Sequence, residues 1–174
     1  MIDYLIGKPQ HTEAIARLHA YSWQQHYRGI FNDEYLDHEV MNDRIDVWQR
    51  RFEKPTENQH VVLAQDHQLL CGFGCIFKEH DPDYGALLDN LHVHPEWQGR
   101  GIGKELMKRC SQWLINQDPQ AKLYLWVLQE NSKARQFYEG LGGEAQDCIV
   151  EHNPGGGSSE ILRIVWSNPE LLVN

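Results

Sequence analysis

The sequence predicts one domain of the mixed α/β (α+β) class, with helices on the faces of a β-sheet. Short apolar or β-branched segments separated by turn residues predict β-hairpins. The stretch from residue 86 to residue 141 predicts a β-α-β-α unit, which is typical of a sheet covered by helices. Neither a repeat nor a low-complexity block divides the 174 residues, so we expect a single domain spanning residues 1–174.

The first part of the chain alternates between strands and helices. Ile15, Leu18 and Ser22 have helical spacing after Thr12, a suitable N-cap residue. The expected elements are a strand at residues 2–6, a helix from Thr12, a helical stretch at residues 33–51 broken near Val40, and a strand at residues 59–64.

The second part predicts more strands and two further helices. Gly72 and Gly74 indicate a bulge or a close backbone approach, and the continuous apolar run 123–128 favours a buried strand. The expected elements are strands at residues 69–79 and 86–93, a helix at 101–116, a strand at 123–128, a helix capped by Asn131, and strands at 145–151 and 160–165.

The composition excludes several classes of protein. A net charge of −9 argues against nucleic acid as a partner, because phosphate binding needs a basic surface, and it is compatible with a cationic substrate. We expect no membrane segment, since no apolar run approaches ~18 residues, and no signal peptide, hence a cytoplasmic location. The four cysteines lack CxxC spacing, which favours reduced, mostly buried thiols.

Residues 91–104 (LHVHPEWQGRGIGK) run from a predicted strand through a glycine-rich turn into a helix. Glycines let backbone N–H groups point inward, and a helix N-terminus adds partial positive charge. Such a turn suits a phosphate or pyrophosphate. The dinucleotide fingerprint does not fit, because it needs glycine where the chain has Lys104. The P-loop motif does not fit, because it needs glycine where the chain has Gln98.

Two spaced motifs carry a family resemblance. Gln98-x-x-Gly101-x-Gly103, preceded by Leu-His-Val-His-Pro, resembles the signature (Gln/Arg)-x-x-Gly-x-(Gly/Ala) and the strand end Leu-Tyr-Val-x-Pro before it. Residues 131–142 (NSKARQFYEGLG) resemble Asn-x-x-Ala-x-x-Phe-Tyr-x-x-x-Gly. Both motifs, in this order, belong to the GCN5-related N-acetyltransferase (GNAT) family, which the chain resembles over residues 59–145.

The resemblance implies a fold and a cofactor site. The fold is a mixed, mostly antiparallel sheet of about seven strands with about four helices on both faces. A splayed strand pair, 86–93 and 123–128, is implied to hold acetyl-CoA as co-substrate, and no metal is implied. The implied cofactor-binding residues are Leu91, His92, Val93, Gln98, Gly99, Arg100, Gly101, Ile102, Gly103, Lys104, Asn131 and Lys133.

The resemblance also implies direct acetyl transfer to an amine while both substrates are bound. Backbone N–H groups from Leu91 to Val93 would stabilise the oxyanion, Asn131 would bond the pantetheine arm, and Tyr138 would protonate the departing thiolate. The pattern alone favours Tyr138 as a core residue of its helix, and Asn131 is either a helix cap only or both a cap and a ligand.

The general base is not assigned, because the chain departs from the family at its usual position. Many members carry Glu four residues before the position of Leu91, and here that residue is Leu87. Asp89, which by strand alternation shares a face with Leu91, and His92, on the opposite face, are the candidates. Gly143 is a second departure, since many relatives carry an aromatic residue there.

The acceptor site is the least determined part of the sequence. Trp23 and Tyr27 either line an acceptor pocket or belong to an aromatic core. The loop 155–159 is either a lid or an ordinary hairpin loop.

Three functions stay open at this stage. The leading one is acetylation of a small-molecule primary amine, and the alternative within enzymes is acetylation of a protein N-terminus or lysine. A non-catalytic acyl-CoA-binding module is the alternative from another class. A homodimer is an expectation from the family alone.

Overall fold

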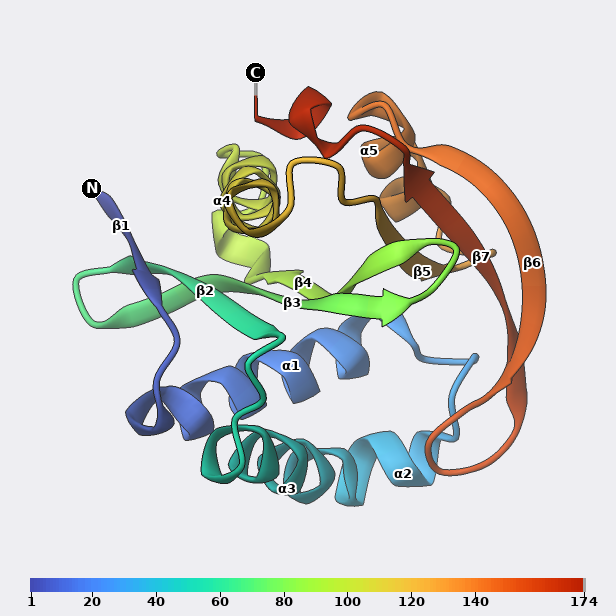
Figure 1. Cartoon of the computed structure of the whole chain (residues 1–174). Helices are drawn as coiled ribbons and strands as arrows, with labels where there is room; N and C mark the ends of the chain where they lie inside the picture. The colour runs from blue at the N-terminus through green and yellow to red at the C-terminus, as the bar shows by residue number, and fades with distance from the viewer. Residues whose placement is uncertain (174) are drawn as a thin grey trace.

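The computed structural model describes residues 1–173, and Asn174 lies outside them. These residues form five α-helices and a central sheet of seven strands, whose arrangement can be followed in Figure 1. The strands are β1 (Ile2–Ile6), β2 (Gln59–Asp66), β3 (Leu69–Asp81), β4 (Gly85–Val93), β5 (Leu123–Leu128), β6 (Glu144–His152) and β7 (Ser158–Trp166). The helices are α1 (Thr12–His26), α2 (Asp33–His38), α3 (Val40–Glu53), α4 (Ile102–Gln117) and α5 (Ser132–Gly140), with short 3-10 turns at Pro9–His11, Pro95–Trp97 and Pro169–Leu172.

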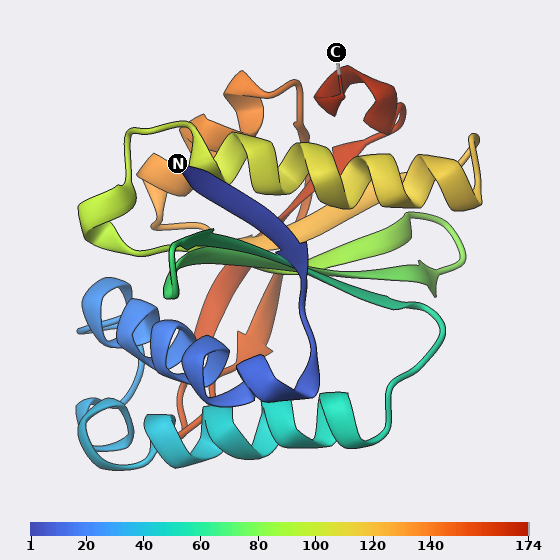
Figure 2. The ribbon, with the colours of Figure 1, turned by 90° about the vertical axis from the view of Figure 1, so that its left-hand side faces the viewer.

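The sheet has the strand order β1-β2-β3-β4-β5-β7-β6. All neighbouring strands run antiparallel except β4 and β5, which are parallel. Figure 2 shows α1, α2 and α3 on one face of the sheet and α4 and α5 on the other. The predicted mixed, mostly antiparallel sheet with helices on both faces is therefore confirmed.

The helical stretch predicted at residues 33–51 is two helices that meet at Glu39. Asn32 begins the first, since its side-chain oxygen accepts hydrogen bonds from the backbone N–H groups of Glu34 and Tyr35 at 2.8 and 3.3 Å. The expected break near Val40 is confirmed, and it sets α2 at the end of α3 beside the connection that follows α1.

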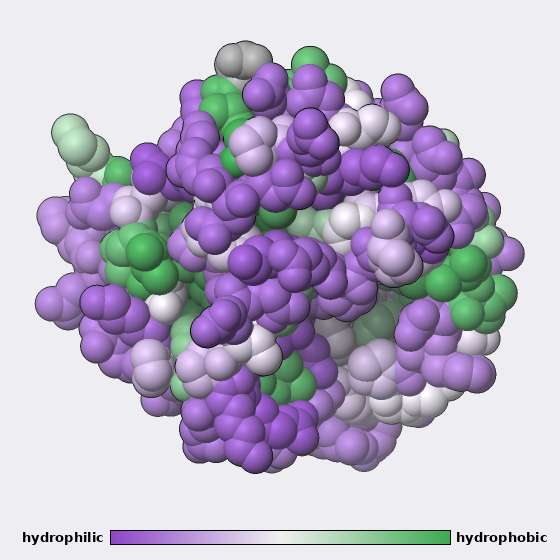
Figure 3. Space-filling model, viewed as in Figure 1, coloured by the Kyte–Doolittle hydropathy of each residue, from purple (hydrophilic) through white to green (hydrophobic). Residues whose placement is uncertain are grey.

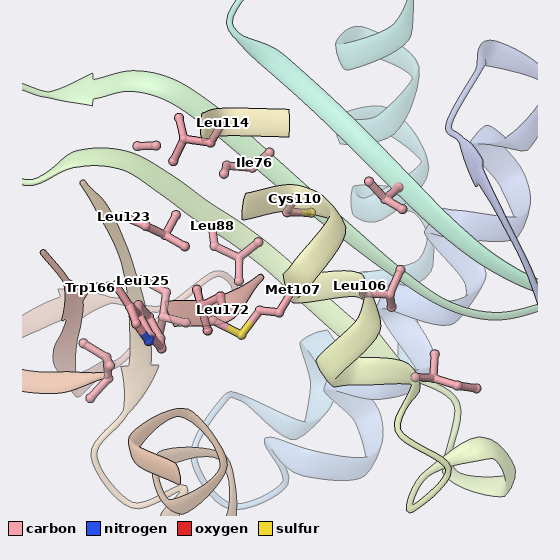
Figure 4. Packing of buried hydrophobic residues seen from close by; sticks show 14 of the residues in the cluster. Ile76, Leu88, Leu106, Met107, Cys110, Leu114, Leu123, Leu125, Trp166 and Leu172 are labelled. Atoms are coloured by element: carbon pink, nitrogen blue, oxygen red, sulfur yellow. The ribbon is translucent and has the colours of Figure 1, made fainter. Parts of the chain in front are cut away.

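A large apolar cluster fixes α4 against the sheet (Figure 4). Leu106, Cys110 and Leu114 of α4 are almost fully buried against Ile76 and Leu88 of the sheet. Full burial of each such leucine contributes about 1.5–3 kcal/mol. The cluster thereby anchors the start of α4, and with it the glycine-rich turn that precedes the helix.

A second cluster fixes α1 and α3 on the opposite face. Ile15 of α1, Trp48 of α3 and Phe73 of β3 are all fully buried. The indole N–H of Trp48 donates to Nδ1 of His19 at 3.1 Å, which ties the two helices together. The cluster therefore fixes the positions of the side chains that the two helices direct toward β4.

The cysteines and the helix lengths bear on two expectations from the composition. Cys71, Cys75 and Cys110 are buried free thiols, as expected, whereas Cys148 is exposed. Within residues 1–173, no helix is both long and apolar enough to cross a membrane.

Candidate active site

The parallel strands β4 and β5 separate soon after they meet. They pair only at Ala86 with Leu123 and at Leu87 with Tyr124. Beyond that point, residues 88–93 of β4 and 125–128 of β5 line opposite walls of a cleft of about 620 Å³. Backbone groups that would have paired the two strands are thereby available to a ligand.

A β-bulge in β4 accompanies the separation. Ile76 of β3 lies opposite Leu88, but its neighbour Cys75 lies opposite Asn90, so Asp89 is the extra residue. A bulge bends its strand and interrupts its ladder of hydrogen bonds. The bend lies next to the last residue of β4 that pairs with β5, so it marks where the cleft opens.

The bulge corrects one prediction about side-chain direction. Leu91 packs against the cluster under α4, whereas the Asp89 carboxylate bonds Arg51 of α3 at 2.7 Å. Asp89 and Leu91 therefore do not share a face, because the extra residue breaks the alternation on which that expectation depended. Asp89 still lines the cleft.

The glycine-rich turn has the geometry of an anion site. Gly99 and Gly101 have φ of +74° and +78°, a conformation that favours glycine. A Cβ on either residue would meet no atom within 4 Å, so the backbone conformation, not crowding, requires glycine there. Gly101 begins α4 without a side-chain cap, which leaves the first N–H groups of the helix available to a phosphate.

Side chains from two elements brace this turn. The Gln98 amide donates to the Val93 carbonyl at 3.2 Å, and the Lys133 ammonium donates to the Gln98 side-chain oxygen at 3.2 Å. Lys104 also lines the cleft, whereas Arg100 does not, since its guanidinium lies over the Trp97 ring at 4.6 Å. The turn therefore offers two cations besides its N–H groups.

Tyr138 lines the cleft from α5, and Asn131 lines it from the N-cap position of the same helix. The side-chain oxygen of Asn131 accepts from the Ala134 N–H at 3.1 Å, so Asn131 is a cap that also lines the cleft. The Tyr138 ring packs edge-on against Trp166, and its hydroxyl has no hydrogen-bond partner within residues 1–173. Burial, with a smaller contribution from nearby Tyr27, raises the pKa of Tyr138, so its phenol stays protonated.

His92 extends from β4 toward α1. Its Nδ1 lies 2.8 Å from the Ser22 hydroxyl, and its ring lies 4.7 Å from the ring of His19. Burial, helped by the charges of His26 and Arg44, lowers the pKa of His92 to about 3. The imidazole is therefore neutral near physiological pH.

Trp23 and Tyr27 line the end of the cleft that α1 forms. Their rings lie 5.6 Å apart, and both pack against Phe31. Arg44 of α3 lies over the Trp23 ring at 4.2 Å. The two residues therefore belong to an aromatic cluster and also face the cleft, and their contact with an acceptor stays a prediction.

The known proteins similar to this chain include acetyltransferases of one family. The model of the acetyltransferase (GNAT) family matches residues 16–142. The chain belongs to the GNAT family. It is 26% identical over 148 residues to the uncharacterized N-acetyltransferase YuaI of Bacillus subtilis, covering 83% of this chain and 81% of YuaI.

Solved GNAT structures share the fold at lower identity. The PaiA N-acetyltransferase of Thermoplasma acidophilum, in complex with coenzyme A, superposes with a TM-score of 0.67 at 20% identity, covering 94% of this chain and 98% of PaiA. A variant of the spermidine N-acetyltransferase SpeG of Vibrio cholerae gives 0.68 at 19% identity, covering 99% and 96%. This GNAT chain is accordingly an acyltransferase with the family's fold.

The loop that was a candidate lid lies behind the aromatic end of the cleft. The Asn153 amide donates to the Ile30 carbonyl at 3.4 Å and to the Ser159 hydroxyl at 2.8 Å. A Cβ on Gly155 would lie 2.3 Å from the Cβ of Tyr35, so the β6–β7 loop packs closely on α2. The loop therefore braces the connection between α1 and α2, and none of its residues lines the cleft.

Sequence reasoning did not find several residues of this GNAT site. The sequence places Ser22 on a helix stripe without indicating its contact with His92, and Arg51 carries no signal, since it meets Asp89 across 38 positions of sequence. Trp126 and Phe137 also line the cleft. Alternation along β5 and helical spacing in α5 are the signals that would have suggested this pair.

Proposed function

We propose that this GNAT enzyme transfers the acetyl group of acetyl-CoA to a primary amine of a small molecule, by direct attack in a ternary complex. The observation that carries the proposal is one cleft lined by two different kinds of group. A glycine-rich helix N-terminus and two lysines line it, and so do the aromatic rings of Trp23 and Tyr27. The first group suits an anionic cofactor, and the second suits an organic amine.

The proposed cofactor contacts follow the family motifs. The turn from Gln98 to Lys104 would hold the pyrophosphate through N–H groups, with Lys133 beside it. Asn131 keeps its amide N–H groups for a ligand, because the helix cap uses only its oxygen. Acetyl-CoA supplies the acetyl group as a thioester when it is bound.

We assign the catalytic work to groups at the fork between β4 and β5. Backbone N–H groups of residues 91–93 would stabilise the oxyanion, and the protonated Tyr138 hydroxyl would donate to the departing sulfur. Asp89 or His92, acting through water, would receive the amine proton. The low pKa of His92 makes it a weak proton acceptor.

A small acceptor is favoured over a protein because the aromatic end is backed by packed structure. The connection between α1 and α2 is held from behind by Asn153 and Gly155 of the β6–β7 loop. A polypeptide substrate needs an open groove, whereas an aromatic-walled pocket suits a compact amine.

Turnover on a panel of amines tests the proposal. Thiol release from acetyl-CoA is followed with small primary amines, polyamines, and peptides with free N-termini or lysines. Release with small amines supports the proposal, and release with peptides alone replaces it with protein acetylation. Saturable acetyl-CoA binding without thiol release for any acceptor would leave a non-catalytic acyl-CoA-binding module.

We further propose a cytoplasmic homodimer. The outer strand β6 is an exposed sheet edge, and Ile149 and Val150 on it are 39% and 66% exposed. Figure 3 shows apolar residues at the right-hand edge of the face, where β6 runs in Figure 1. Unpaired strand edges favour association, and reduced thiols suit the cytoplasm. Light scattering of the purified protein tests the dimer.

A further inference from the structure

The β4 bulge is held by one side chain from outside the cleft. Arg51, in the last turn of α3, donates to the Asp89 carboxylate at 2.7 Å and to the Asn90 side-chain oxygen at 2.9 Å. These are the extra residue of the bulge and the residue that follows it. Arg51 does not itself line the cleft, whereas both of its partners do.

The Arg51 guanidinium is itself held firmly. It lies over the Trp48 ring at 4.8 Å and over the Phe77 ring at 5.2 Å, and its side chain is 22% exposed. Trp48 is fully buried in the cluster that fixes α3. A cation in the last turn of a helix also meets the negative end of the helix dipole. The N–H donors of the Arg51 guanidinium are therefore held in one position and one orientation.

A bulge needs such support, because it gives up part of the strand ladder. The side chain of Asn90 is directed into the protein, with only 9% of the residue exposed, so its oxygen requires a donor there. The Arg51 guanidinium is partly buried as well, and a charge removed from water requires a partner of opposite charge, here a carboxylate. A bidentate guanidinium satisfies both side chains together and fixes the spacing between them.

We infer that Arg51 is a positioning residue for acetyl transfer, which holds the β4 bulge in the shape that separates β4 from β5. The inference rests on the proposed function, since residues 91–93 directly follow the bulge and supply the oxyanion donors. Without Arg51, the segment 88–93 relaxes, and the N–H groups lose their alignment with the thioester carbonyl. Misplacement by about 1 Å costs roughly 100-fold in rate.

Arg51→Met, Arg51→Lys and Asp89→Asn test the inference, with Arg50→Met as the matched control. Arg50 lies on the same turn of α3 and is exposed, and it makes no ion pair within residues 1–173. We expect Arg51→Met to lower kcat about 10- to 100-fold while the Kd for acetyl-CoA changes little. Arg51→Lys keeps the charge without the fork and should fall between wild type and Arg51→Met.

Hydrogen exchange supplies a readout that does not depend on the acceptor. Amides of residues 87–93 should exchange faster in Arg51→Met than in Arg50→Met, with unfolding temperatures measured alongside. If wild type turned over no amine, faster exchange would still support the clamp, and only the proposed function would fail. If Arg51→Met kept wild-type kcat, or if exchange rose equally in both arginine variants, the inference would be overturned.

Asp89→Asn separates positioning from proton transfer. The asparagine retains an oxygen acceptor for Arg51, so a positioning role predicts a smaller loss of kcat than in Arg51→Met, at every pH. A larger loss than in Arg51→Met, together with disappearance of a low-pH inflection, would assign Asp89 as the base and contradict the clamp as its main role. Even if Arg51→Met failed to fold, Arg51→Lys and Asp89→Asn would decide the question.

Discussion

Replacing Tyr138 by phenylalanine removes one hydroxyl and leaves the packing of its ring intact. Within the described residues this hydroxyl bonds no other group, and the ring contacts Trp166 by its edge. Because no internal hydrogen bond is lost, the free energy of unfolding should stay within about 0.5 kcal/mol of wild type. The pKa of Tyr138 is raised above its usual value of 10, so its phenol is a weaker acid than an ordinary thiol, and full proton transfer to a thiolate is uphill.

The hydroxyl therefore acts mainly by donating a hydrogen bond to the charged sulfur. Such bonds contribute about 1.5–3 kcal/mol, which corresponds to roughly 10- to 150-fold in kcat. Steady-state thiol release with saturating acetyl-CoA measures the loss, with Tyr21→Phe as the control, since Tyr21 stacks on His94 and does not line the cleft. An unchanged kcat in Tyr138→Phe would refute the assignment. The expected loss of kcat accompanied by a lower free energy of unfolding than in wild type would also refute it.

Three other changes have clear expected outcomes. The pKa of His92 falls from 6.5 to about 3 on folding, so the contribution of this group to the free energy of unfolding is fully present above pH 6.5. That contribution is lost as the pH falls toward 3, by up to about 1.4 kcal/mol per pH unit. Urea unfolding of wild type and His92→Asn between pH 7.5 and 4.5 checks this slope. Gly155→Ala puts a methyl group 2.3 Å from Tyr35 at φ +78° and should raise KM for the acceptor, but not for acetyl-CoA. Gly156→Ala, at φ +98° with open space around it, is the matched control. Gly143→Ala places its Cβ 2.4 Å from a β7 side chain and should cost about 1–3 kcal/mol by urea unfolding.

The elements and the cofactor turn were predictable because their signals are local. Residues 91–104 carry strand, turn and helix start in one stretch, and the turn adopts the positive φ that its glycines indicate. Asn131 likewise combines a cap and a cleft position within one motif.

What the sequence did not reveal depends on contacts between distant residues. The direction of Asp89 was predicted wrongly, because one extra residue in β4 reverses the alternation and no residue type announces a bulge there. The sequence also does not reveal why position 143 carries glycine. Its missing side chain leaves space that Trp166 of β7 occupies, so an aromatic residue at 143 would collide with the indole.

The position of the last strand bears on how the protein is made. Strand β7 inserts between β5 and β6, and the Asn153 amide reaches back 123 positions to the Ile30 carbonyl. While the chain is being synthesised, β5 thus lacks its second neighbour, and the connection between α1 and α2 lacks its brace, until the β6–β7 loop and β7 have left the ribosome. Such long-range closure slows folding and exposes an unpaired strand to other chains. A nascent chain that lacks β7 should consequently depend on chaperones, and the enzyme becomes competent only after β7 is in place.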